Sequence, residues 1–181
     1  VMADLSPDTK LSRIGLVLGE GSDEHLVAAK QRWMEAVEWQ PLRRLVEDML
    51  VVRDWFEVYV AQLAVLDGLL YPLVTEAFER AGTAHNGAPV SMLTSFLGDW
   101  YADNCRWVDA VLKAAAAESE DNRAVLNGWL DHWGARAAEA LAPLATDVLS
   151  DMGPAALNDA RQQLATRLQK LDLTPTKELA A

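Results

Sequence analysis

Residues 41–70 read PLRRLVEDMLVVRDWFEVYVAQLAVLDGLL, and this stretch decides the fold class. Its apolar positions recur at steps of three and four residues, which is typical of an α-helix with one buried face. The positions on this predicted face are Leu42, Leu45, Met49, Val52, Phe56, Tyr59, Leu63, Leu66 and Leu70. Pro41 suits the first turn of a helix. We therefore predict one long helix from residue 41 to about 81, which Pro72 kinks or divides because it removes a backbone hydrogen bond.

Helical spacing continues on both sides of this stretch. Ser22 is a predicted N-cap for a helix that runs to about Val37, and Ser91 for a long helix that reaches about Glu118. The predicted inward positions of the second of these helices are Leu93, Leu97, Trp100, Asn104, Trp107, Val111 and Ala114.

Two more helices complete the prediction. The first follows a turn and cap at Asp121 and Asn122, and the second follows Gly153-Pro154. Their predicted inward positions are Leu126, Trp129, Trp133, Ala137, Leu141 and Leu144, then Leu157, Leu164, Leu168 and Leu171. The sequence thus predicts an all-α protein, a bundle of long helices. Its expected parts are an irregular segment over 1–21, a helical domain over 22–173 and a frayed tail over 174–181.

Charge and composition exclude several classes of protein. The 181 residues include 16 Lys and Arg against 27 Asp and Glu, a net charge of −11. Such a surface repels nucleic acid and anionic membranes. The single cysteine, Cys105, cannot form a disulfide within the chain. We find no apolar run of about 18 residues and no signal-peptide pattern, so we predict a cytoplasmic protein that binds neither nucleic acid nor membranes.

The residues do not suggest a metal, cofactor or catalytic site. A di-iron site in a helical bundle takes two Glu ligands and two Glu-x-x-His motifs, because residues three apart share a helix face. The three histidines are His25, His85 and His132, and the residues three positions before them are Ser22, Gly82 and Trp129. We therefore predict that this chain contributes no catalytic, cofactor-binding or metal-ligating residue.

Polar residues interrupt two of the predicted apolar faces. Asn104 lies on one face with Asp103 and Arg106 beside it, and Asp67 interrupts the other. Buried polar groups need hydrogen-bond partners. We therefore expect a buried polar network that contains an Asp103–Arg106 ion pair and Asp67, with a role in folding or assembly.

Two long strings carry a family resemblance. The first comprises LRRLVEDMLVVRDWFEVYVAQ at 42–62 and VLDGLLYPLV at 65–74; the second comprises SMLTSFLGDWYAD at 91–103 and RWVDAVLK at 106–113. They resemble the β subunit of multicomponent phenol hydroxylase, one of the bacterial di-iron aromatic monooxygenases. The resemblance extends over roughly residues 24–173 and covers the C-terminal part of that subunit.

This resemblance implies a ferritin-like fold, related to the small subunit of ribonucleotide reductase, without metal ligands. The family's catalytic pattern is Asp-Glu-x-Arg-His, in which Glu and His bind iron; here the same helix reads Asp103-Asn104-Cys105-Arg106-Trp107. Asparagine is a poor iron ligand and tryptophan is none. The resemblance therefore implies that Asn104 and Trp107 are vestigial metal-site positions and that Trp107 fills the bundle interior.

The leading hypothesis is a non-catalytic subunit of a phenol 2-monooxygenase-type oxidoreductase complex. As the resemblance implies, it packs against and supports a catalytic α subunit that carries the di-iron centre. That subunit hydroxylates phenol-type aromatics with O₂ and NADH-derived electrons. A γ subunit and a second protomer are further candidate partners. The alternative is an independent helical binding module with no link to oxygenation. A metal enzyme in its own right is disfavoured by the missing Glu-x-x-His motifs.

Overall fold

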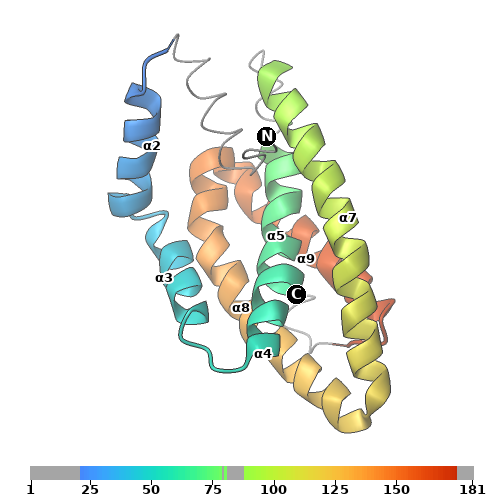
Figure 1. The fold of residues 1–181 in the computed structure, drawn as a ribbon. Helices are drawn as coiled ribbons and strands as arrows, with labels where there is room; N and C mark the ends of the chain where they lie inside the picture. Colours follow the sequence, from blue (N-terminus) through green and yellow to red (C-terminus); the bar gives the residue numbers. More distant parts are fainter. Residues whose placement is uncertain (1–20, 79, 81–87, 175–181) are drawn as a thin grey trace, which may run out of the picture. The chain divides into compact units, whose positions relative to one another are not determined.

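The computed structural model describes residues 21–78, 80 and 88–174, and all regular secondary structure in these ranges is helical (Figure 1). The predicted all-α class is confirmed. The elements are α2 (Glu24–Glu35), α3 (Gln40–Met49), α4 (Trp55–Tyr59), the π-helical η1 (Val60–Leu66), α5 (Asp67–Pro72), the π-helical η2 (Leu73–Phe78), α7 (Ala88–Glu118), α8 (Glu120–Leu149), the 3₁₀ turn η3 (Ser150–Met152) and α9 (Gly153–Gln169).

The chain divides into two compact units, Val1–Gln40 and Pro41–Ala181. The predicted boundaries at 21/22 and 173/174 stay predictions, because residues 1–20 and 175–181 lie outside the described residues. Residues 81–87 also lie outside them, and α7 begins directly after this gap, at Ala88.

In the first unit, polar side chains set both ends of α2. The predicted N-cap Ser22 is wrong by one residue, because Asp23 holds the N-cap position. Ser22 lies just before it, and its Oγ accepts the backbone N–H of Glu24 at 3.2 Å. At the other end the side-chain amide of Gln40 donates to the carbonyl of Ala36 at 3.1 Å. The helix ends at Glu35, slightly before the predicted end at about residue 37.

The predicted single helix over residues 41–81 is wrong. Helix α3 ends at Met49, and α4 begins at Trp55. Between them the backbone makes short turns, and Asp54 Oδ1 then accepts the N–H of Phe56 at 2.8 Å. An aspartate that caps a new helix competes with continuation of the old one, which the apolar spacing alone does not reveal.

The two π-helical segments shift the buried face of the helix that follows. Apart from Leu66, the buried residues here form pairs that recur every four positions: Val60, Ala61, Ala64, Val65, Gly68, Leu69, Pro72 and Leu73. An α-helix repeats every 3.6 residues, and the wider turns of a π-helix make up the difference. The predicted face is therefore right at Leu42, Leu45, Met49 and Leu66, whereas Val52, Phe56, Tyr59, Leu63 and Leu70 are only half-buried. Pro72 is the last residue of α5, but helical backbone continues directly into η2, so Pro72 does not divide the helix.

Helices α8 and α9 form most of the remaining core. Helix α8 packs on α9, η1 and α7, and α9 also packs on α5. The predicted inward positions of both helices are buried, except that Trp129 is half-buried. Ser119 caps α8 by accepting the N–H of Asn122 at 3.0 Å, so the helix begins slightly earlier than predicted.

The predicted inward face of α7 is right at Leu97 but wrong by about one residue from Trp107 onward. The helix begins at Ala88, before the predicted cap Ser91. Its buried apolar side chains, in the part whose side chains are described, are Leu97, Val108, Leu112 and Ala116. Trp107 is 56% exposed and Trp100 is 40% exposed, so the predicted interior position of Trp107 is wrong. Adjacent helical residues point about 100° apart. The smaller aliphatic side chains therefore turn inward and the indoles are displaced to the flank.

One helical stretch among the described residues, Trp55–Ala77, is long and apolar enough to cross a membrane by length and composition. This corrects the prediction that the chain has no such run. Half of the apolar window is buried inside the fold. A helix in the core of a folded domain passes the same test, so length and composition alone are weak evidence for a membrane span.

The start of α9 depends on a glycine. A Cβ at Gly153 would lie 2.7 Å from the backbone carbonyl atoms of Ala145, whereas a Cβ at Gly128, inside α8, would meet no described atom within 4 Å. We expect Gly153→Ala to lower the free energy of unfolding by about 1–3 kcal/mol, because backbone cannot move aside cheaply. Gly128→Ala should raise it by up to about 1 kcal/mol. Urea denaturation of both variants measures this, and equal effects would contradict the close approach.

Candidate functional site

The predicted network around Asp103 and Arg106 is not buried. The two side chains pair with each other, but they are 71% and 79% exposed. The prediction of a buried pair is therefore wrong, because these residues lie on the outer side of α7 once its buried face passes through Val108 and Leu112. An exposed pair of this kind contributes little to stability.

A different polar cluster lies where α5, α7 and α9 meet, and Asp67 belongs to it. Arg167 of α9 donates from Nε to Asp109 Oδ1 at 2.8 Å and from Nη1 to the hydroxyl of Tyr101 at 3.4 Å. Asp67 of α5 and Cys105 of α7 both interact electrostatically with the same guanidinium. We call Asp67, Tyr101, Cys105, Asp109 and Arg167 the arginine cluster. The sequence predicted a buried polar network that contained Asp67, but it assigned the ion pair to Asp103 and Arg106 instead of Asp109 and Arg167.

Burial governs the protonation of this cluster. Removal from water raises the pKa of Asp67 to about 6, and the positive charge of Arg167 opposes the rise. Burial also raises the pKa of Cys105, against a hydrogen bond from Tyr101 and the charge of Arg167. Burial raises the pKa of Tyr101 as well. These are the shifts expected of groups held away from solvent around one fixed cation.

Two polar atoms in or next to the arginine cluster have no hydrogen-bond partner among the described residues. They are the hydroxyl oxygen of Tyr59 and Nη2 of Arg167, and both are buried. Arg167 and Asp109 act electrostatically on Tyr59, which places its hydroxyl near the arginine cluster. Buried polar atoms in stable folds usually have partners.

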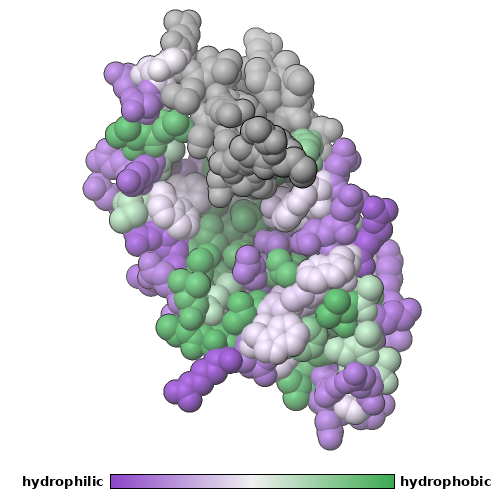
Figure 2. All heavy atoms as spheres, viewed as in Figure 1, coloured by the Kyte–Doolittle hydropathy of each residue, from purple (hydrophilic) through white to green (hydrophobic). Residues whose placement is uncertain are grey.

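Tyr59 also connects the arginine cluster to an exposed group of aromatic rings on α4 and α7. Ring centroids lie 5.2 Å apart for Trp55–Phe56, 5.4 Å for Phe56–Tyr59 and 5.4 Å for Tyr59–Trp107. Trp55 is 75% exposed. We call Trp55, Phe56, Tyr59, Trp100 and Trp107 the aromatic face. Figure 2 shows pale aromatic and green apolar side chains gathered over the region of α4 and α7.

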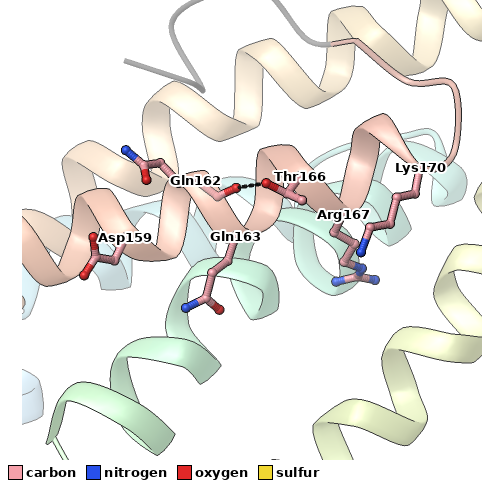
Figure 3. A pocket seen from close by; sticks show the side chains of 6 residues that line it. All are labelled: Asp159, Gln162, Gln163, Thr166, Arg167 and Lys170. Carbon is pink, nitrogen blue, oxygen red and sulfur yellow. Dashed lines mark hydrogen bonds between the residues drawn. The ribbon is translucent and has the colours of Figure 1, made fainter.

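An open groove of about 550 Å³ runs along α9 beside the arginine cluster. It is lined by Asp159, Gln162, Gln163, Thr166, Arg167 and Lys170 (Figure 3). Gln163, Arg167 and Lys170 extend to the same side of the helix. Gln163 Nε2 donates to Glu76 Oε2 of η2 at 3.1 Å. Mixed charges and an open shape indicate a solvated polar surface.

The residues do not fit a di-iron centre. Among the described residues, no three His, Cys, Asp or Glu side chains are grouped so that they could hold a metal ion. Asn104 is half-buried and Trp107 is exposed, and neither side chain suits iron. His132 is exposed, and its ring contacts Trp133. His85 lies outside the described residues.

Comparison with known proteins agrees with this helical architecture. The family model described as Methane/Phenol/Alkene Hydroxylase matches residues 9–119. The chain belongs to the methane/phenol/alkene hydroxylase family. A relative in this family, the phenol 2-monooxygenase oxygenase component DmpL of Pseudomonas sp. strain CF600, is 49% identical over 93% of the chain and 50% of the relative. The β subunit of the toluene-4-monooxygenase hydroxylase of Ectopseudomonas mendocina is 30% identical over 71% of the chain and 39% of that subunit.

A solved structure of the hydroxylase family shows the same fold. The xenon-pressurised phenol hydroxylase of Pseudomonas sp. OX1 contains a chain that superposes with a TM-score of 0.84 at 44% identity, over 91% of this chain and 49% of that one. The predicted family and its ferritin-like fold are confirmed. The chain spans about half the length of the curated relatives it matches, DmpL included.

The arginine cluster predicts a contrast between two aspartates of α7. Asp109→Ala removes the partner of a largely buried guanidinium, and we expect a loss of about 3 kcal/mol in the free energy of unfolding. Asp103→Ala, the matched control, removes the partner of an exposed guanidinium and should cost less than about 1 kcal/mol. Denaturant unfolding of both variants measures the difference. Equal losses would contradict the arrangement.

Asp67 predicts a pH dependence of stability. Its pKa is about 6 in the fold, against an ordinary value of 3.8, so the folded state binds the proton more tightly. The stability that Asp67 contributes is therefore full below about pH 4, falls as pH rises to about 6 and stays low above it, a change of about 3 kcal/mol. Asp67→Asn should remove this loss and be more stable than the wild type at pH 7. Thermal melts from pH 4 to 8 measure it, and parallel curves for the two proteins would contradict it.

Proposed function

We propose that this chain is part of the non-catalytic β subunit of a soluble, cytoplasmic di-iron hydroxylase. In this role it packs against and supports the catalytic α subunit, which hydroxylates phenol-type aromatics with O₂ and NADH-derived electrons. A γ subunit and a second protomer are further partners of the proposed complex. The observation that carries the proposal is the 49% identity to a phenol 2-monooxygenase oxygenase component across 93% of the chain.

The chemistry of the described side chains supports a structural role. The proposed vestigial positions carry an amide at Asn104 and an indole at Trp107, where iron would need a carboxylate and an imidazole. We propose that the iron of the complex is bound by the catalytic subunit alone. What this chain supplies is a set of fixed helices, joined by Arg167 and Asp109, against which other helices pack.

Exposed aromatic side chains also support a role in assembly. Tryptophan and tyrosine are the residues most enriched at the centres of protein interfaces. In this chain Trp55 and Trp107 expose more than half of their surface. The ring of Trp55 contacts Phe56, and the ring of Trp107 contacts Tyr59. The alternative of an independent binding module would use the same surface, but family membership favours a hydroxylase partner.

The proposal predicts binding to an iron-containing partner. Tagged chain, co-expressed with the catalytic subunit of a phenol 2-monooxygenase, should co-purify with it, and the iron should follow the catalytic subunit. The chain purified alone should contain well under one iron per molecule by inductively coupled plasma mass spectrometry. A chain that holds about two irons by itself, or that never retains the catalytic subunit, would contradict the proposal.

A further inference from the structure

The three tyrosines of the chain meet two exposed tryptophans of α7. Tyr71 of α5 stacks on Tyr101 of α7, with ring centroids 4.8 Å apart and ring planes 2° from parallel. The ring of Tyr71 also lies 5.5 Å from that of Trp100, which is 40% exposed. Tyr59 contacts Trp107, with ring centroids 5.4 Å apart. A phenol therefore lies against each of these two indoles.

This arrangement places side chains that lose one electron readily in contact with each other. A one-electron oxidant that meets Trp100 takes an electron from the indole, and the indole N–H proton passes to water, which leaves an indolyl radical. Near neutral pH, the phenoxyl radical of tyrosine is more stable than the indolyl radical of tryptophan. A phenol in ring contact can therefore return an electron to the oxidised indole.

We propose that Tyr71 and Tyr101, the tyrosine pair, donate electrons that restore Trp100 after its one-electron oxidation by oxygen-centred radicals. One electron passes from the pair to the indolyl radical. The phenol releases its proton to water and the indole nitrogen takes a proton from water, so that indolyl radical and phenol become indole and phenoxyl radical. A soluble one-electron reductant, with a proton from water, then returns the phenoxyl radical to the phenol. This inference does not depend on the proposed function.

The surroundings of the tyrosine pair suit a neutral radical. Nη1 of Arg167 donates to the hydroxyl oxygen of Tyr101 at 3.4 Å, and a phenoxyl oxygen can still accept this hydrogen bond. The positive charge of Arg167 disfavours a phenol radical cation, so the proton leaves together with the electron. Tyr71 and Tyr101 are both half-buried, so they are partly shielded from solvent while their protons can still reach water.

Trp33 provides a comparison within the same chain. It is 36% exposed, close to the 40% of Trp100. Its ring contacts Trp39, at a centroid distance of 5.5 Å, and no ring contact with a tyrosine is found among the described residues. Similar exposure gives the two indoles similar access to a small oxidant. Less lasting oxidation at Trp100 than at Trp33 would therefore measure repair by the tyrosine pair.

The test exposes the full chain to azidyl radicals, which are one-electron oxidants, and measures the oxidised fraction of each tryptophan by peptide mass spectrometry. Trp100 should be oxidised at least about threefold less than Trp33, the ratio that a barrier difference of about 0.6 kcal/mol produces. Tyr71→Phe keeps the stacked ring but removes the oxidisable phenol, and it should abolish this difference. Trp39→Phe is the matched control, because it changes the ring beside Trp33 and should leave the oxidation of Trp100 unchanged.

Pulse radiolysis with azidyl radicals provides a second readout, in a Tyr59→Phe background whose remaining tyrosines are the pair. Phenoxyl absorption should grow as indolyl absorption decays, at a rate that does not depend on protein concentration. Adding Tyr71→Phe should slow this growth at least about tenfold.

Three outcomes would overturn the proposal. The first is equal oxidation of Trp100 and Trp33 in the wild type. The second is an unchanged ratio in Tyr71→Phe, once a thermal melt shows that this variant folds as the wild type does. The third is phenoxyl growth whose rate rises with protein concentration, which would mean that the electron comes from another molecule. The first and third outcomes need no variant of the tyrosine pair.

Discussion

A single guanidinium, largely removed from water, links three helices of the second unit. The side chain of Arg167 is only 14% exposed, and it joins α9 to two residues of α7, Asp109 and Tyr101. A cation in such a place must be paired, and the planar fork of arginine accepts few geometries. Helix α5 is the third helix at this point, and its Gly68 lies against Leu164 of α9. A Cβ at Gly68 would lie 2.9 Å from Leu164 Cδ1. Close packing of α5 on α9 there brings Asp67 toward the same cation.

The sequence predicted the fold class, the family and the buried faces of α8 and α9, because those helices are regular and their apolar residues keep an α-helical repeat. It failed where the repeat changes. Asp54 starts a new helix in the middle of an apolar series, and the π turns on either side of α5 move the buried positions from a 3.6-residue to a four-residue repeat. Neither change alters the local composition enough to be visible beforehand.

The polar cluster was missed for a related reason. Sequence reasoning found Asp103 and Arg106 because they are three residues apart, but local spacing says nothing of burial. The actual partners, Asp109 and Arg167, are 58 positions apart and meet only through tertiary packing. Asp67 was identified because it interrupts an apolar series. Arg167 offered a comparable signal, since it lies next to the buried Leu168 in a helix with few other basic residues.

Helix α7 explains why the predicted and observed faces differ. Leu97, Val108 and Leu112 bury one side of it against the rest of the unit, while Trp100 and Trp107 are partly exposed beside the charged pair Asp103–Arg106. A prediction from apolar spacing assumes that the helix has one buried face, so it must choose between these two sides. Because tryptophan is larger than valine, the prediction favours the side that carries Trp107. The error at Trp107 therefore came from counting a large aromatic ring as buried, where the structure buries the smaller Val108 instead.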